Sequence, residues 1–108
     1  MRVLIDSTNC TTANAATQLR TTDTASRVIY FKATIRAGSG GPASVGNSST
    51  VTAADIGYQL SSASDAASSV SLAFPLRGDA TTGVGVSQFW MNSSTTVAQV
   101  DHVMVVVP

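Results

Sequence analysis

Apolar and polar residues alternate with a period of two along much of this chain. The clearest stretch runs from Arg27 to Ala37. Neighbouring side chains of a β-strand point to opposite faces, so this alternation predicts a strand with one buried and one wet face. The predicted inward positions are Ile29, Phe31, Ala33 and Ile35, and the outward ones are Tyr30, Lys32, Thr34 and Arg36.

The same alternation predicts several further strands, separated by turns rich in Gly, Ser, Asn and Asp. No window of about a dozen residues shows the three- and four-residue spacing of a helix. About seven to nine short antiparallel strands predict an all-β fold, a small two-sheet β-sandwich or jelly roll. The other expected strands are Val3–Ile5, Ala16–Arg20, Ala43–Gly46, Thr50–Ala53, Ile56–Leu60, Val70–Leu76 (with Val70, Leu72, Phe74 and Leu76 inward), Val84–Met91 and Val97–Val107.

The length fits one domain. With 108 residues and 11.0 kDa, the chain is expected to form a single β-sandwich over residues 1–108, in which residues 1–15 supply an N-terminal arm and the first strand.

The last predicted strand carries valines at both odd- and even-numbered positions, so both of its faces are apolar. A bare, flat, apolar edge of this kind templates aggregation. Val97–Val107 is therefore expected either to lie in the middle of a sheet or to be covered by a neighbouring subunit.

The aromatic pair Phe89 and Trp90, together with Met91, is the most informative cluster of large side chains. Because adjacent residues of a strand face opposite ways, at least one of these large side chains leaves the sandwich interior unless both faces of the strand are covered. In one interpretation Trp90 fills the core and Phe89 is half exposed. In the other, one of the aromatic side chains anchors a contact between subunits, where aromatic residues and Met are enriched.

Charged groups are scarce. They make up 11% of the residues, six basic residues balance six acidic ones, glutamate is absent and Lys32 is the only lysine. A neutral surface concentrates neither nucleic acid nor anionic membrane lipid, so neither is an expected partner. A Ser- and Thr-rich surface without net charge favours a subunit of an assembly. The alternative is an ordinary exported β-domain.

Residues that could carry chemistry are few and scattered. His102 is the only histidine, Cys10 is the only cysteine, and the six aspartates stand singly. Asp101 and His102 are expected on opposite faces of a strand, so they cannot form a catalytic dyad. We therefore expect no catalytic residue, no metal site and no cofactor, and we expect the protein not to be an enzyme.

Two sequence signals concern location. The apolar run Val3–Ile5 is too short for the core of a signal peptide, and no run is long enough to span a membrane, so synthesis in the cytoplasm is expected. Arg77-Gly78-Asp79 resembles integrin-binding tripeptides, but each of its residues is ordinary in a turn. Composition is therefore the preferred explanation of this tripeptide.

The order of short motifs resembles a group of small virion proteins of tailed bacteriophages. Ala16-Thr17-Gln18-Leu19 is similar to that group's early Gln-Leu strand, and Val28–Ala33 to its following Lys-Ala strand. Val45–Thr52 resembles a Val-Gly-Asp/Asn-Ser turn and strand, and Ile56–Leu60 a Gly-x-x-Leu step. Val84–Asn92 takes the place of a late strand that carries an aromatic residue.

The resemblance implies a β-sandwich that is built many times into a phage particle. The expected function is capsid decoration or cementing, in which a homotrimer binds the lattice of the major capsid protein on the virion. A tail or fibre subunit that recognises the host surface, through loops such as Gly38–Pro42 and Arg77–Gly83, is the alternative. The residues expected at the contact are Met1, Arg2, Val3, Leu4, Ile5, Phe89, Trp90 and Met91.

Overall fold

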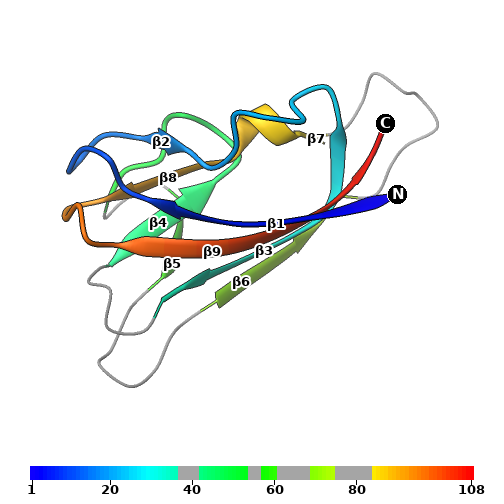
Figure 1. Ribbon diagram of the computed structural model, residues 1–108. Helices are drawn as coiled ribbons and strands as arrows, with labels where there is room; N and C mark the ends of the chain where they lie inside the picture. The colour runs from blue at the N-terminus through cyan, green and yellow to red at the C-terminus, as the bar shows by residue number, and fades with distance from the viewer. Residues whose placement is uncertain (37–41, 54–56, 61–68, 75–83) are drawn as a thin grey trace.

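A computed structural model describes residues 1–36, 42–53, 57–60, 69–74 and 84–108. Within these ranges the chain is all-β, with nine strands and one short 3₁₀ helix (Figure 1). The strands are β1 (Arg2–Asn9), β2 (Thr17–Gln18), β3 (Arg27–Ile35), β4 (Ala43–Gly46), β5 (Tyr58–Leu60), β6 (Ser69–Ala73), β7 (Val84–Gly85), β8 (Trp90–Ser93) and β9 (Gln99–Val107), and the helix η1 spans Val86–Gln88.

The strands form two antiparallel sheets, which confirms the predicted two-sheet sandwich. The five-stranded sheet has the order β1-β9-β3-β6, with β7 paired to one end of β3. The four-stranded sheet has the order β2-β8-β4-β5. The first and last long strands, β1 and β9, pair along eight residues, and the two termini therefore lie at the same end of the molecule (Figure 1).

Strand β9 occupies the centre of the larger sheet, between β1 and β3. One of the two alternatives predicted for this two-sided apolar strand is thereby confirmed. Its even-numbered residues face the other sheet and are buried, whereas its odd-numbered residues are only partly covered. The buried set is Val100, His102, Met104 and Val106.

Strand β3 confirms most of its predicted alternation and corrects one position. Phe31, Ala33 and Ile35 are fully buried as predicted. Ile29 is only partly buried, and Val28 takes the inward position instead. The reason is a shift of register against β9 between Val28 and Tyr30, which inserts an extra residue and reverses the parity of the side chains.

Val84–Met91 is not one strand. The segment begins as β7, turns through η1 and continues as β8. Residues three apart in a 3₁₀ helix lie on the same face, so Val86 and Phe89 both point inward and both are fully buried. The interpretation that Trp90 fills the core while Phe89 is half exposed is therefore wrong, because Phe89 is the core residue and Trp90 is only partly buried.

Thr50–Ala53 was predicted as a strand, and it is not one. The segment packs on the outer side of the smaller sheet, where Val51 is buried. Asn92 Nδ2 donates to the carbonyl oxygen of Val51, and Ser44 Oγ donates to that of Ala53. These side-chain bonds satisfy two carbonyl groups of the segment in place of a sheet ladder.

The first strands also differ from their predicted bounds. Val3–Ile5 lengthens to β1, which is a full member of the sheet rather than a free arm, and Ala16–Arg20 shrinks to the two residues of β2. Val70, Leu72 and Phe74 pack against the core as predicted. Ile56, Leu76, the turn at Arg77–Gly83 and most of the turn at Gly38–Pro42 lie outside the described residues.

Candidate functional site

The outer face of the five-stranded sheet is the candidate functional site. Because β9 buries its even-numbered residues, Val103 and Val105 point outward. Their partners in the two neighbouring strands share that face. One row across the sheet is Ile5, Val103, Lys32 and Ser71, and the next is Val3, Val105, Tyr30 and Ala73.

This face exposes large apolar side chains next to each other. Ile5 is 73% exposed, Val3 is 56% exposed and Tyr30 is 36% exposed. Val103 and Val105 beside them are partly exposed. Contiguous apolar surface of this kind marks an interaction site more often than scattered single residues do.

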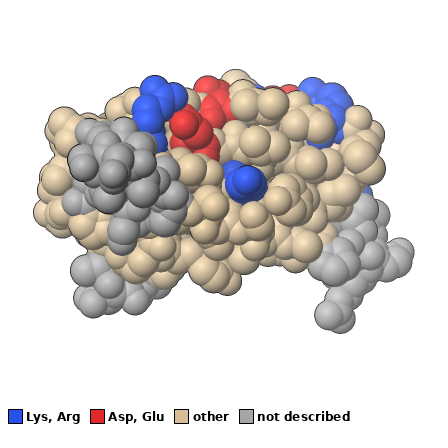
Figure 2. Space-filling model, turned by 90° about the horizontal axis from the view of Figure 1, so that it is seen from below, with Lys and Arg blue, Asp and Glu red and all other residues tan. Residues whose placement is uncertain are grey.

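Few charges interrupt this surface. Lys32 lies in the row of Val103, and the Asp101 and Arg36 pair lies one step along the sheet, with 2.8 Å between Arg36 Nη2 and Asp101 Oδ1. In the space-filling view, most of the visible surface carries neither sign of charge, and the charged side chains form small groups (Figure 2). Contacts at this face are therefore expected to depend on apolar burial more than on salt-sensitive attraction.

The outer face of the smaller sheet, unlike that of the larger sheet, is covered by a segment of the chain. Ser44 and Asn92 point outward on that sheet, yet both are buried because the segment that contains Val51 covers them. Gly46 and Gly57 allow this close approach, since a side-chain carbon added at Gly46 would lie 2.6 Å from Val51 Cγ1. Among the residues that the structure describes, the chain thus covers one outer face of the sandwich and leaves Val3 and Ile5 exposed on the other.

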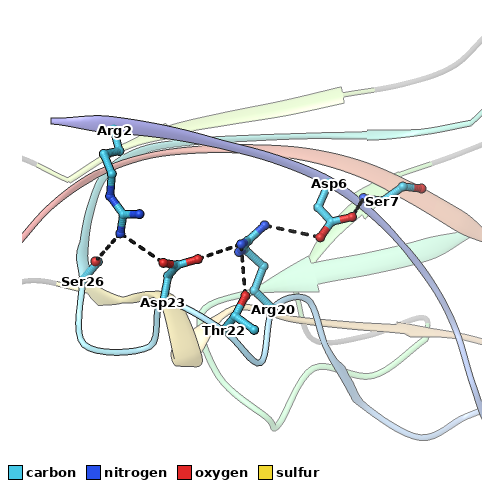
Figure 3. Close-up of polar contacts among 7 residues, drawn as sticks. All are labelled: Arg2, Asp6, Ser7, Arg20, Thr22, Asp23 and Ser26. Atoms are coloured by element: carbon cyan, nitrogen blue, oxygen red, sulfur yellow. Dashed lines mark hydrogen bonds and ion pairs between the residues drawn. The ribbon is translucent and has the colours of Figure 1, made fainter.

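Along the β1 side, four ionised groups join the sheet to the loop before β3 (Figure 3). Arg20 lies between two carboxylates, with Nη2 at 2.8 Å from Asp23 Oδ2 and Nη1 at 3.3 Å from Asp6 Oδ2. Arg2 Nη2 is 3.1 Å from the other oxygen of Asp23. Asp23 adopts a left-handed backbone conformation with φ of 59°, which Asp tolerates better than most residues do.

The same contacts set the ionisation of Asp23. Hydrogen bonds from Arg20 and then from Arg2 lower the pKa of the Asp23 carboxyl below its usual value. The carboxylate therefore stays ionised and holds both arginines in place. This cluster has the form of a structural tie between β1 and the loop.

His102 is buried on the inner face of β9 and is 1% exposed. Its Nε2 lies 2.9 Å from Thr8 Oγ1, which lies 2.9 Å from the carbonyl oxygen of Leu19. The single hydroxyl proton of Thr8 must go to the carbonyl, so His102 donates from Nε2, and no described group binds Nδ1.

This environment favours the neutral form of His102. Burial lowers the pKa of the imidazole, while the Asp6 carboxylate opposes that change and Arg20 reinforces it. Asp101 points to the opposite face and pairs with Arg36, which agrees with the expectation that the two neighbours form no dyad. His102 is thus a buried residue of the sandwich whose Nε2 is bonded to Thr8.

The remaining candidates for chemistry lie apart. Cys10 is buried, and its Sγ donates to the carbonyl oxygen of Thr12 at 3.1 Å. Among the described residues, no three His, Cys, Asp or Glu side chains come together as metal ligands, and this part of the chain encloses no pocket. None of its helices has the length and apolar character needed to cross a bilayer.

The structure separates the eight predicted contact residues into two groups. Met1, Arg2, Val3 and Ile5 are exposed, and Trp90 is partly exposed on the other sheet. Leu4, Phe89 and Met91 pack in the chain's own core, so in this conformation they offer no surface to another molecule. Sequence reasoning missed Tyr30, Val103 and Val105 as neighbours of Val3 and Ile5, although the two-sided pattern of the last strand was the available signal.

Comparisons with protein-family models, with curated proteins and with solved structures found no match for this chain.

Proposed function

We propose that this protein is a structural virion protein of a tailed bacteriophage that decorates the capsid by binding the lattice of the major capsid protein. The observation that carries the proposal is the open outer face of the five-stranded sheet. It presents Val3, Ile5, Tyr30, Val103 and Val105 in two adjacent rows, in which Lys32 is the one charged residue.

Two further features support a structural subunit. Among the described residues, no three His, Cys, Asp or Glu side chains come together as metal ligands, and the His102 side chain is bonded to Thr8 within the sandwich. The chain also has a formal net charge of zero, so many identical copies bound near one another repel each other little. Weak contacts that are repeated across a lattice add up to stable attachment.

Quantitative mass spectrometry of purified particles of the phage that encodes this chain tests the proposal. A capsid decoration protein is expected in hundreds of copies per particle, and particles that lack it are expected to lose heat tolerance. A copy number of a dozen or fewer would instead assign the chain to the tail. Absence from the particle would refute both assignments.

A binding experiment tests the proposed face directly. Purified protein is added to particles that lack it, and bound protein is measured after sedimentation. The double variant Tyr30→Ser with Val105→Ser should bind much less than the wild-type protein, because it removes apolar surface from the middle of the outer face. Thr50→Ala, an exposed change on the segment that covers the opposite sheet, is the matched control and should bind as the wild type does.

A further inference from the structure

We propose that two copies of this chain pair through β1 in an antiparallel, two-fold symmetric ladder centred on Leu4. The proposal concerns an edge of the larger sheet, since β1 is the last strand in the order of the described strands. It follows from the geometry of that edge and does not depend on the proposed function.

The hydrogen bonds of β1 establish which of its backbone groups are free. The N–H of Cys10 donates to the carbonyl oxygen of Ala98 at 3.2 Å, one step beyond the pair Asn9 and Gln99. Backbone groups of an antiparallel strand point alternately to its two sides, so the even-numbered residues of β1 face β9. Val3 and Ile5 therefore direct their N–H and C=O groups to the open side.

Ser7 confirms this parity and marks where the free edge ends. Its N–H points to the open side and is occupied by Asp6 Oδ1 at 2.8 Å. Among the described residues, no backbone group bonds the N–H of Val3 or Ile5. The open part of the edge is thus the segment Arg2–Asp6, which has no proline and pairs with β9 without a bulge. Such an edge is a template for another strand.

The charges of β1 match a second copy in one register. When Leu4 faces Leu4 of the second copy, Val3 faces Ile5 of the second copy, and their free backbone groups form hydrogen bonds. Arg2 then faces Asp6 of the second copy, twice by symmetry. Centring the ladder on Val3 or on Ile5 places a charged residue opposite Leu4 instead, so charge complementarity selects the Leu4 register.

The side chains that this register brings together are available. The Arg2 side chain is 60% exposed and that of Asp6 is 58% exposed. Their present partners, Asp23 and Arg20, lie on the loop before β3, so the pairing adds to the ion-pair cluster of each copy (Figure 3). On the outer side, Val3 and Ile5 of the two copies would join the two apolar faces into one continuous surface.

The contact involves about five residues of each chain, which places it among small interfaces and predicts weak, concentration-dependent association. Sedimentation velocity over a range of concentrations should therefore show a monomer passing to a species of twice the 11.0 kDa chain mass. A monomer at all concentrations would refute the pairing. A species of three chain masses would also refute it, because a two-fold contact between edges closes as a dimer.

A proline scan along β1 locates the contact. Ile5→Pro removes an N–H that points to the open side and leaves the ladder with β9 complete, so the fold should persist. The dissociation constant of the dimer should rise about tenfold or more, since symmetry loses the bond twice. Asn9→Pro is the matched control, because its N–H also points outward but lies beyond the paired segment. Dimers that survive Ile5→Pro would refute the proposal.

A charge-reversal experiment tests the register. Arg2→Asp alone and Asp6→Arg alone each place like charges opposite one another and should give monomers. An equimolar mixture of the two variants places an acidic edge against a basic one and should restore a dimer that contains one copy of each. Circular dichroism checks that each variant is folded. Failure of the mixture to dimerise, with both variants folded, would exclude the Leu4-centred register.

Discussion

Phe31 of the larger sheet and Phe89 after the 3₁₀ helix stack with ring centroids 4.5 Å apart and an angle of 25° between the rings. Phe74 meets the edge of Phe89 at 5.7 Å. All three come from different segments, so this cluster connects β3, the end of β6 and the start of β8. Phe31 and Phe89 are the largest fully buried side chains among the described residues.

Replacement of Phe89 by Ala should therefore cost about 3–5 kcal/mol of unfolding free energy, from lost burial and from the cavity left behind. Trp90→Ala removes a larger side chain that is only partly buried, and should cost less. Urea unfolding of the two variants measures the difference, and Phe89→Leu keeps the comparison possible if Phe89→Ala does not fold. A greater cost for Trp90→Ala would contradict the orientation of this segment.

The sequence pattern alone predicted the fold class and much of the alternation, and it failed at particular places for physical reasons. Phe31, Ala33 and Ile35 were placed correctly because regular pleating has a strict period of two. Ile29 was misplaced because the register shift after Val28 breaks that period. Nothing in the local residue types marks the shift, which depends on how β3 meets β9.

The candidate site could be predicted only in part. Val3 and Ile5 were recognised as contact residues from their position near the start of the chain, and the outer face does contain them. Its other members come from β9 and β3, and which strands lie side by side depends on topology that alternation does not encode. Phe89 and Met91 were expected at the contact because a continuous strand was assumed, whereas the 3₁₀ helix turns both of them into the core.

Acid should weaken the fold through His102. Because burial lowers the pKa of this imidazole in the folded chain, the unfolded chain binds a proton more readily. The free energy of unfolding should be unchanged by this group above its unfolded pKa of 6.5, and should fall as the pH drops below that value towards the folded pKa. The slope from one group is at most about 1.4 kcal/mol per pH unit.

His102→Gln tests this expectation, because the glutamine amide can still donate to Thr8 but does not titrate. His102 is the only histidine, so its replacement should flatten the decline between about pH 7 and about pH 5. Urea unfolding at a series of pH values measures the slope. Asp6, Arg20 and Asp101 also act on the imidazole and are present in both proteins. An equal slope in both proteins would show that His102 is not the group responsible.

Arg20 should matter more than Arg36. The side chain of Arg20 is 12% exposed and contacts two carboxylates, whereas Arg36 and Asp101 form a pair in which both side chains are about half exposed. Arg20→Ala should lower the unfolding free energy by about 1–3 kcal/mol, because the carboxylates of Asp6 and Asp23 then lose the guanidinium group that lies between them. Arg36→Ala should cost about 1 kcal/mol or less.

The same cluster predicts a response to acid at lower pH. The pKa of Asp23 is lowered in the folded chain, so its stabilising effect is present above the unfolded pKa of 3.8 and is lost as the pH falls through the folded pKa. Asp23→Asn should reduce the loss of stability over that range. A separate measurement at low and at high salt compares the two arginines. Screening by salt should weaken the exposed pair of Arg36 and Asp101 more than the contacts of Arg20.

A side chain at Gly57 should destabilise the fold. Its φ of 120° is a conformation that other residues rarely adopt, and a side-chain carbon there would lie 3.0 Å from the carbonyl oxygen of Val45. Gly57→Ala should cost about 1–3 kcal/mol. Gly85→Ala is the control, because its backbone is extended and the nearest atom is 3.8 Å away. Equal unfolding free energies for the two variants would contradict the packing around Val51.

Identical substitutions at two adjacent residues of β9 test which face of the sheet is open. Val105 points to the outer face and is partly exposed, whereas Val106 points to the core and is 1% exposed. Val105→Thr should change the unfolding free energy by about 0.5 kcal/mol or less, because its hydroxyl can reach water. Val106→Thr buries a hydroxyl among apolar neighbours and should cost about 1–3 kcal/mol. The order of the two costs follows from the parity of β9, so the reverse order would place the apolar outer face on the wrong side of the sheet.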